Sequence, residues 1–150
     1  MVTVEVFGKL PSGVSVQSLK KLAEIGQKVI GSRDRTGLSV SIVSDAAIRR
    51  LNRQYRGLDK VTDVLSFGYG EARDFFGPAD GQRADLGDIV ISGPQVRRQA
   101  VAIGRPVDQE FSLLFVHGLL HLLGFDHGTA AQEARMFGLQ QEVLMRAGIF

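Results

Sequence analysis

The most apolar stretch of the chain, residues 111–125, constrains the fold more than any other feature. It is shorter than the roughly 20 residues that a membrane-spanning helix needs, and it is interrupted by Ser112, His117 and His121. The stretch is apolar on nearly every side, which is typical of a helix buried at the centre of a domain. We therefore expect the other elements to pack around this helix, and we expect no membrane partner.

Strand-like and helix-like segments alternate on both sides of this stretch. Alternation of apolar and polar residues, or short apolar runs, predicts four strands at residues 2–7, 38–43, 64–67 and 88–91. Apolar residues at helical spacing predict five helices at residues 15–30, 44–53, 94–104, 106–124 and 129–148, with Ser44 and Thr129 as N-caps. These elements predict an α+β fold, with a small mixed β-sheet of about four strands packed with about five helices.

Composition limits what else the chain can be. No repeat, low-complexity tract or Pro/Ser-rich linker divides its 150 residues, so we expect a single domain over residues 1–150. The absence of cysteine excludes a disulfide partner and thiolate metal ligands. The N-terminus lacks the basic and apolar regions of a secretory signal, which favours a cytoplasmic protein. A net charge of +2 does not by itself indicate a nucleic-acid partner.

All three histidines of the chain lie within eleven residues. His117 and His121 are one helical turn apart, and Gly124 allows the chain to reverse so that His127 can complete a set of three nitrogen ligands. Three protein ligands leave an open coordination position, as in catalytic zinc sites. A lone histidine on an apolar helix is usually a core residue, but three at this spacing predict one shared metal ion. Zn²⁺ suits imidazole ligands, with nickel, copper or iron as alternatives.

The same histidine spacing occurs in zinc proteases with the motif His-Glu-x-x-His-x-x-Gly-x-x-His. The glutamate that acts as general base in those enzymes falls at Gly118, which cannot transfer a proton. This difference disfavours peptide hydrolysis by their mechanism. Asp126, beside His127, could orient a ligand or accept a proton from metal-bound water, or it could only cap the local backbone.

A basic segment precedes the third predicted strand. Its cations recur at helical spacing or lie close by: Arg49, Arg50, Arg53, Arg56 and Lys60. Three aromatic residues are near in sequence: Tyr55, Phe67 and Tyr69. Arginines that bind phosphates and rings that stack on bases are what unpaired nucleic acid requires. The alternative interpretation is an ordinary solvated helix face.

Three motifs, in the same order along the chain, resemble the YbeY family of bacterial endoribonucleases. They are residues 51–67 (LNRQYRGLDKVTDVLSF), 86–92 (LGDIVIS) and 117–127 (HGLLHLLGFDH). The resemblance implies a zinc-dependent, single-strand-specific endoribonuclease of the cytoplasm that acts in rRNA maturation, including 16S rRNA 3′ end processing, and in small-subunit quality control. The implied partners are single-stranded RNA and rRNA, and the small ribosomal subunit with its assembly factors.

The resemblance also assigns residues. His117, His121 and His127 match the family's metal ligands, and Arg56 matches its functionally important arginine after the tyrosine. We therefore expect His117 and Arg56 to be catalytic, with one zinc ion, or another transition metal such as nickel, as the cofactor.

The chain departs from the family pattern in two places. Val61 and Gly68 stand where the family usually has proline, which puts loop rigidity in doubt but not the site. The resemblance assigns no role to residues 70–84.

These residues lead to a mechanistic hypothesis. A metal held by the histidines activates water, or polarises a phosphate oxygen, while Arg56 stabilises charge on the phosphate that is cleaved. With Gly118 in the usual base position no general base is identifiable, so direct hydrolysis and attack by the substrate's 2′-hydroxyl are both open. Ser66 and Asp63 could line the cleft, but a strand serine and a turn aspartate are more often structural.

Two other function classes stay open. One is a non-catalytic, RNA-binding ribosome-assembly factor whose metal is structural. The other is a metal-dependent peptidase or amidase, against which Gly118 argues.

Overall fold

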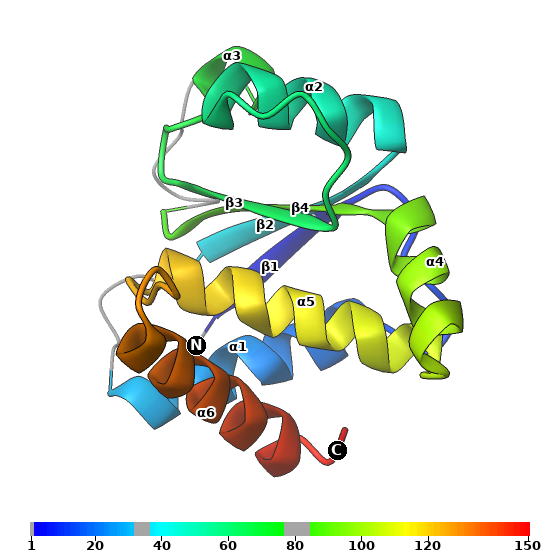
Figure 1. Cartoon of the computed structure of the whole chain (residues 1–150). Helices are drawn as coiled ribbons and strands as arrows, with labels where there is room; N and C mark the ends of the chain where they lie inside the picture. The colour runs from blue at the N-terminus through cyan, green and yellow to red at the C-terminus, as the bar shows by residue number, and fades with distance from the viewer. Residues whose placement is uncertain (1, 32–36, 77–84) are drawn as a thin grey trace.

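The computed structural model describes residues 2–31, 37–76 and 85–150 (Figure 1). The strands are β1 (Thr3–Phe7), β2 (Gly37–Val43), β3 (Val64–Gly68) and β4 (Gly87–Ser92). The helices are α1 (Val16–Ile30), α2 (Asp45–Arg56), α3 (Arg73–Phe76), α4 (Gly93–Ile103), α5 (Val107–Leu122) and α6 (Ala130–Arg146). The predicted α+β class with a small four-stranded sheet is confirmed.

The sheet is mixed, with strand order β1-β2-β4-β3. β1, β2 and β4 are parallel, whereas β3 pairs antiparallel with β4. The helix α1 connects the parallel strands β1 and β2, as a crossover connection requires. All residues of β4 are buried, so this strand forms the centre of the sheet between β2 and β3.

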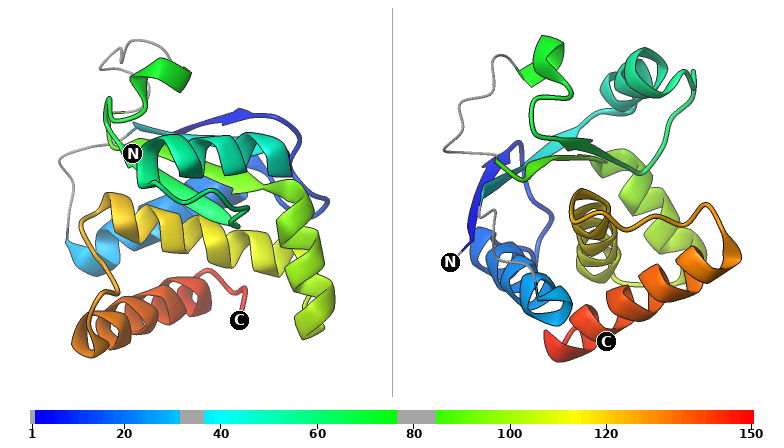
Figure 2. Two further views of the ribbon diagram at one scale, coloured as in Figure 1. Left: turned by 45° about the horizontal axis from the view of Figure 1, so that its top comes forward. Right: turned by 90° about the vertical axis from the view of Figure 1, so that its left-hand side faces the viewer.

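Helices cover both faces of the sheet (Figures 1 and 2). The helix α5 crosses one face with α1 and α6 packed against it, and α2 and α3 lie over the other face. Phe111, Phe115 and Leu119 of α5 are almost fully buried in the larger core. A smaller cluster that includes Ile48, Leu51 and Phe67 lies beneath α2. The apolar stretch thus forms most of the central buried helix that its composition predicts, and this helix ends at Leu122, two residues before Gly124.

The predicted N-caps are present. The Ser44 hydroxyl accepts a hydrogen bond from Ala47 N at 3.2 Å, and Thr129 forms a capping box with Gln132. Such caps satisfy backbone donors that have no partner inside the helix. None of the helices in the described part of the chain combines the length and the apolar character needed to cross a bilayer.

Two elements differ from their predictions. The second helix does not end at Arg53 but continues to Arg56, because Gly57 adopts the left-handed conformation (φ +72°) that closes it. Arg56 is therefore the last residue of α2 and not part of a turn. The short helix α3 lies in a stretch predicted to be a loop. It could not be predicted because four residues are too few to show a helical period. Within residues 70–84, to which no role was assigned, residues 77–84 lie outside the described part of the chain.

Candidate active site

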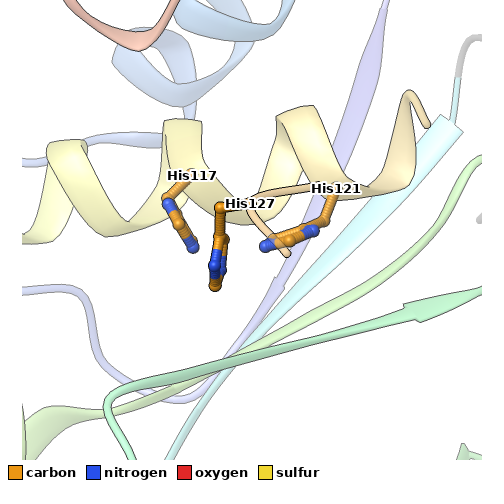
Figure 3. A group of neighbouring side chains, drawn as sticks. All are labelled: His117, His121 and His127. Carbon is orange, nitrogen blue, oxygen red and sulfur yellow. The ribbon is translucent and has the colours of Figure 1, made fainter. Parts of the chain in front are cut away.

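Three imidazoles come together where α5 ends and the chain turns toward α6 (Figure 3). Each offers one nitrogen, and the three nitrogens lie within 4.8 Å of one another. The ring centroids of His117, His121 and His127 form a nearly equilateral triangle, with sides of 4.8, 5.1 and 5.3 Å. Three imidazole nitrogens that lie this close together fit a single divalent transition-metal ion.

The local sequence explains how His127 reaches the other two histidines. After the last turn of α5, Gly124 adopts a positive φ of +101°, and Phe125 N donates to Leu120 O at 3.0 Å. This arrangement ends the helix and reverses the chain, as the glycine predicts. Asp126 Oδ1 accepts a hydrogen bond from His127 N at 2.7 Å, which supports the local-cap interpretation of this aspartate.

The surroundings of His117 and His121 favour neutral imidazoles. Burial lowers the pKa of His117 below its ordinary value of 6.5, and the neighbouring His127 lowers it further, against the hydrogen bond to Gln140. Burial and the two other histidines also lower the pKa of His121. A neutral imidazole keeps the lone pair that a metal ligand needs, so the site is prepared for an ion at neutral pH.

Arg56, which lines the same cavity as the histidines, is held in place by its own helix, by β3 and by the turn that follows β3. Its Nη2 donates to Ser66 O at 2.7 Å, and its Nη1 donates to the Glu71 carboxylate and to Tyr55 O. The guanidinium carbon lies 4.8 Å from the centroid of the Phe67 ring. The side chain remains about one-third exposed (34%), so the guanidinium is fixed but open to solvent.

One cavity of about 730 Å³ contains both groups. The polar side chains of its walls include Arg56, Ser66 and Glu71 on one side, and His117, His121 and His127 on the other. This volume lies within the range of sites that hold small molecules and cofactors. The structure therefore brings together all four residues that the sequence predicts for the site.

The two sides of the cavity meet closely at Gly118. Ser66 Oγ donates to Gly118 O at 3.0 Å, which ties β3 to α5. A Cβ atom at position 118 would lie 3.0 Å from Ser66 Oγ and 3.1 Å from Ile89 Cγ2. A side chain at position 118 would need these neighbours to shift by a few tenths of an ångström, so the tight contact favours the glycine that stands where the zinc proteases have their general base.

The structure corrects part of the predicted nucleic-acid groove. Phe67 is fully buried beneath α2, so its ring is not available to stack on a base, and the half-buried Tyr55 packs edge-on against it with a buried hydroxyl. Tyr69 is exposed (44%). Arg49 is paired with Asp59 at 2.8 Å. Alternation along β3 explains the error, because residues 65 and 67 share its buried face.

Two residues near the site were missed by the sequence analysis. Glu71 lines the cavity and contacts both Arg56 and Gly68 N. Gln140 of α6 lies with Oε1 3.1 Å from His117 Nδ1. Neither residue belongs to a motif that could have identified it. Asp63 and Ser66 both line the cavity, as the sequence allowed, and Asp63 also accepts hydrogen bonds from Val64 N and from Gln99 Nε2.

Comparisons with known proteins agree on one family. The family model described as endoribonuclease YbeY matches residues 12–148. The endoribonuclease YbeY of Bacillus cytotoxicus is 42% identical over 137 residues, covering 89% of this chain and 87% of the relative. That of Moorella thermoacetica is 41% identical over 140 residues, with the same two coverages. The solution structure of TM1509 from Thermotoga maritima is 28% identical, has a TM-score of 0.63, and covers 97% of this chain and 89% of that chain.

Proposed function

This chain belongs to the YbeY endoribonuclease family, and we propose that it cleaves single-stranded RNA with one metal ion held by His117, His121 and His127. Arg56 then acts at the phosphate that is cleaved. One observation carries the proposal: the imidazole cluster and the arginine line the same cavity of about 730 Å³. A structural metal buried away from any cavity would not need a fixed, solvent-accessible guanidinium beside it.

The donor set favours zinc, with nickel as an alternative. When bound, such an ion supplies a Lewis acid and lowers the pKa of a water molecule. The protein contributes the three nitrogens and keeps two of them neutral, since burial lowers the pKa of His117 and of His121. Because His117 would hold the ion that supplies this chemistry, it is both a metal ligand and a catalytic residue in this proposal.

Arg56 retains free donors for a phosphate. A guanidinium has five N–H bonds, and three of them are engaged by Tyr55 O, Ser66 O and the Glu71 carboxylate. Nε–H and one Nη2–H have no partner among the residues that the structure describes. These donors can bind phosphate oxygens and stabilise charge that develops during cleavage, from a guanidinium that is already oriented.

Two nucleophiles are compatible with this site. Gly118 supplies no proton acceptor, so both a water molecule and the 2′-hydroxyl of the substrate stay candidates. The product ends distinguish them, because attack by the 2′-hydroxyl leaves a 2′,3′-cyclic phosphate, whereas attack by water leaves no cyclic product.

We place this activity in the cytoplasm, in rRNA maturation. Family membership supports processing of the 3′ end of 16S rRNA and small-subunit quality control as its role. The small ribosomal subunit and its assembly factors are then the partners that bring the substrate to the enzyme.

The test is cleavage of an end-labelled single-stranded RNA by the zinc-loaded protein. His117→Ala and Arg56→Ala are purified identically, together with Lys21→Ala, which removes an exposed cation of α1 outside the cavity. We expect the wild type and Lys21→Ala to cut, a chelator to stop both, and the other two variants to be inactive. Equal cutting by all four proteins, or binding of RNA without cutting by any of them, would overturn the proposal in favour of a contaminating nuclease or an assembly factor.

A further inference from the structure

Gln140 is the one side chain from α6 that makes a polar contact to the histidine cluster in the described part of the chain. Its Oε1 lies 3.1 Å from His117 Nδ1. An amide oxygen can only accept a hydrogen bond, so this contact requires a proton on Nδ1. The other ring nitrogen, Nε2, then carries the lone pair.

We propose that Gln140 is a positioning residue of the metal centre, which holds His117 in the tautomer with the proton on Nδ1 and so directs Nε2 toward His121, His127 and the ion. The inference rests on the proposed function, because it deepens the role of the same metal site. Histidine ligands commonly donate their second ring N–H to such a partner, and the partner fixes both tautomer and ring orientation.

The packing of α6 makes Gln140 a rigid partner. Met136 and Val143 are fully buried in the core, one turn before and one turn after Gln140. Phe137 precedes Gln140 by three residues and therefore lies on the same side of the helix, with its ring centroid 6.5 Å from that of His117. The helix α6 thus lies against the His117 ring through both Gln140 and Phe137, while the ring extends from α5 toward the other two imidazoles (Figure 3).

His117 also differs from the other two ligands in this respect. In the part of the chain that the structure describes, it is the one imidazole of the cluster that is hydrogen-bonded to another side chain. Its orientation therefore depends on a helix that contributes no ligand of its own. Gln140 would therefore affect ion binding by orienting His117 and not by binding the ion itself.

Two variants and one matched control test the proposal. Gln140→Leu keeps the approximate size and removes the acceptor, and Gln140→Glu keeps an acceptor. Gln141→Leu makes the same change at the exposed neighbouring residue. Affinity for Zn²⁺ is measured on each metal-free protein by competition with a chromophoric chelator, after thermal unfolding has shown that each variant is folded.

We expect Gln140→Leu to bind Zn²⁺ about 10–100-fold more weakly than the wild type, Gln140→Glu to stay within a few-fold, and Gln141→Leu to be unchanged. The tautomer is read separately, from long-range ¹H–¹⁵N correlations of His117 in the metal-free protein. A proton on Nδ1 in the wild type, lost from that position in Gln140→Leu, is the expected result.

Equal Zn²⁺ affinity of Gln140→Leu and Gln141→Leu, or a wild-type proton on Nε2, would refute the role of Gln140. RNA cleavage by the wild type distinguishes this failure from failure of the proposed function. If the wild type cuts RNA but Gln140→Leu does not change Zn²⁺ affinity, only the inference about Gln140 is refuted. If Zn²⁺ binding depends on Gln140 but the wild type never cuts RNA, only the proposed reaction is refuted. A wild type that binds neither Zn²⁺ nor Ni²⁺ refutes both.

Discussion

The close approach of α5 to the sheet at Gly118 makes a quantitative prediction for Gly118→Ala. The new Cβ would lie 3.0 Å from Ser66 Oγ and 3.1 Å from Ile89 Cγ2, and Ile89 is fully buried. Overpacking of this kind costs about 1–3 kcal/mol. Alanine gains about 1 kcal/mol over glycine inside a helix, which offsets part of that cost. We therefore expect Gly118→Ala to lower the free energy of unfolding by about 0–2 kcal/mol.

Gly138 in α6 provides the matched control. It is exposed, and an added Cβ would meet nothing within 4 Å. Gly138→Ala should therefore raise the free energy of unfolding by up to about 1 kcal/mol. The two variants have the same chemical change, so the difference between them, about 1–3 kcal/mol, isolates the packing cost at Gly118. Urea denaturation of the metal-free proteins measures this difference without a contribution from ion binding.

Activity provides a second measurement on the same pair. The contacts at Gly118 require Ser66 of β3 and Ile89 of β4 to give by a few tenths of an ångström. If the whole of α5 shifts on the sheet to relieve them, His117 moves relative to Arg56. We expect cleavage by Gly118→Ala to fall roughly tenfold at a temperature where both variants are folded. If Gly118→Ala is as stable and as active as Gly138→Ala, the tight packing of α5 on β3 is refuted.

Four further predictions concern the site and its charges. Arg56→Lys should cleave RNA about 100-fold more slowly with unchanged Zn²⁺ affinity, because lysine lacks the planar set of donors; normal single-turnover rates would contradict this. Zn²⁺ at 100 times its Kd should stabilise the wild type by about 2.7 kcal/mol, seen as a rise in Tm of about 5–11 °C that His117→Ala lacks. Burial lowers the pKa of His117 and of His121 below 6.5 in the folded protein. As pH falls, these two histidines therefore take up protons at a higher pH in the unfolded chain than in the folded one. The metal-free wild type should therefore lose stability from about pH 7 to pH 5, more than the His117→Ala/His121→Ala double variant does in the same urea titrations. Replacing the exposed Arg50 and Arg53 by alanine should weaken RNA binding and reduce the salt dependence of log K by about 1.4, provided each arginine contacts one phosphate; an unchanged slope would show that this helix face does not bind RNA.

The histidine cluster could be predicted because its geometry is local. Two ligands are one helical turn apart, and Gly124 places the third by a reversal that needs only the next few residues. The resemblance to a family supplied Arg56, but its contacts could not be predicted. Glu71 is one of 16 acidic residues, and only the path of the chain after β3 brings it to the guanidinium.

The errors also have physical reasons. Gly57 is a stronger stop signal than any residue near Arg53, so the end of α2 was readable from the sequence. The burial of Phe67 follows from its place two residues after Leu65 on β3, whereas closeness in sequence to arginines suggested a surface position. Gln140 lies 23 residues from His117 on another helix, and only the packing of two helices brings it to the ring.

The uneven exposure of the three histidines bears on how quickly an ion could be exchanged. His117 and His121 are half-buried on a rigid helix, whereas His127 is exposed on the turn that follows. If an ion is bound, His127 is the ligand that could turn away from it and return without any change in α5. We therefore expect exchange of the ion to depend on motion of this short turn, with the domain folded throughout.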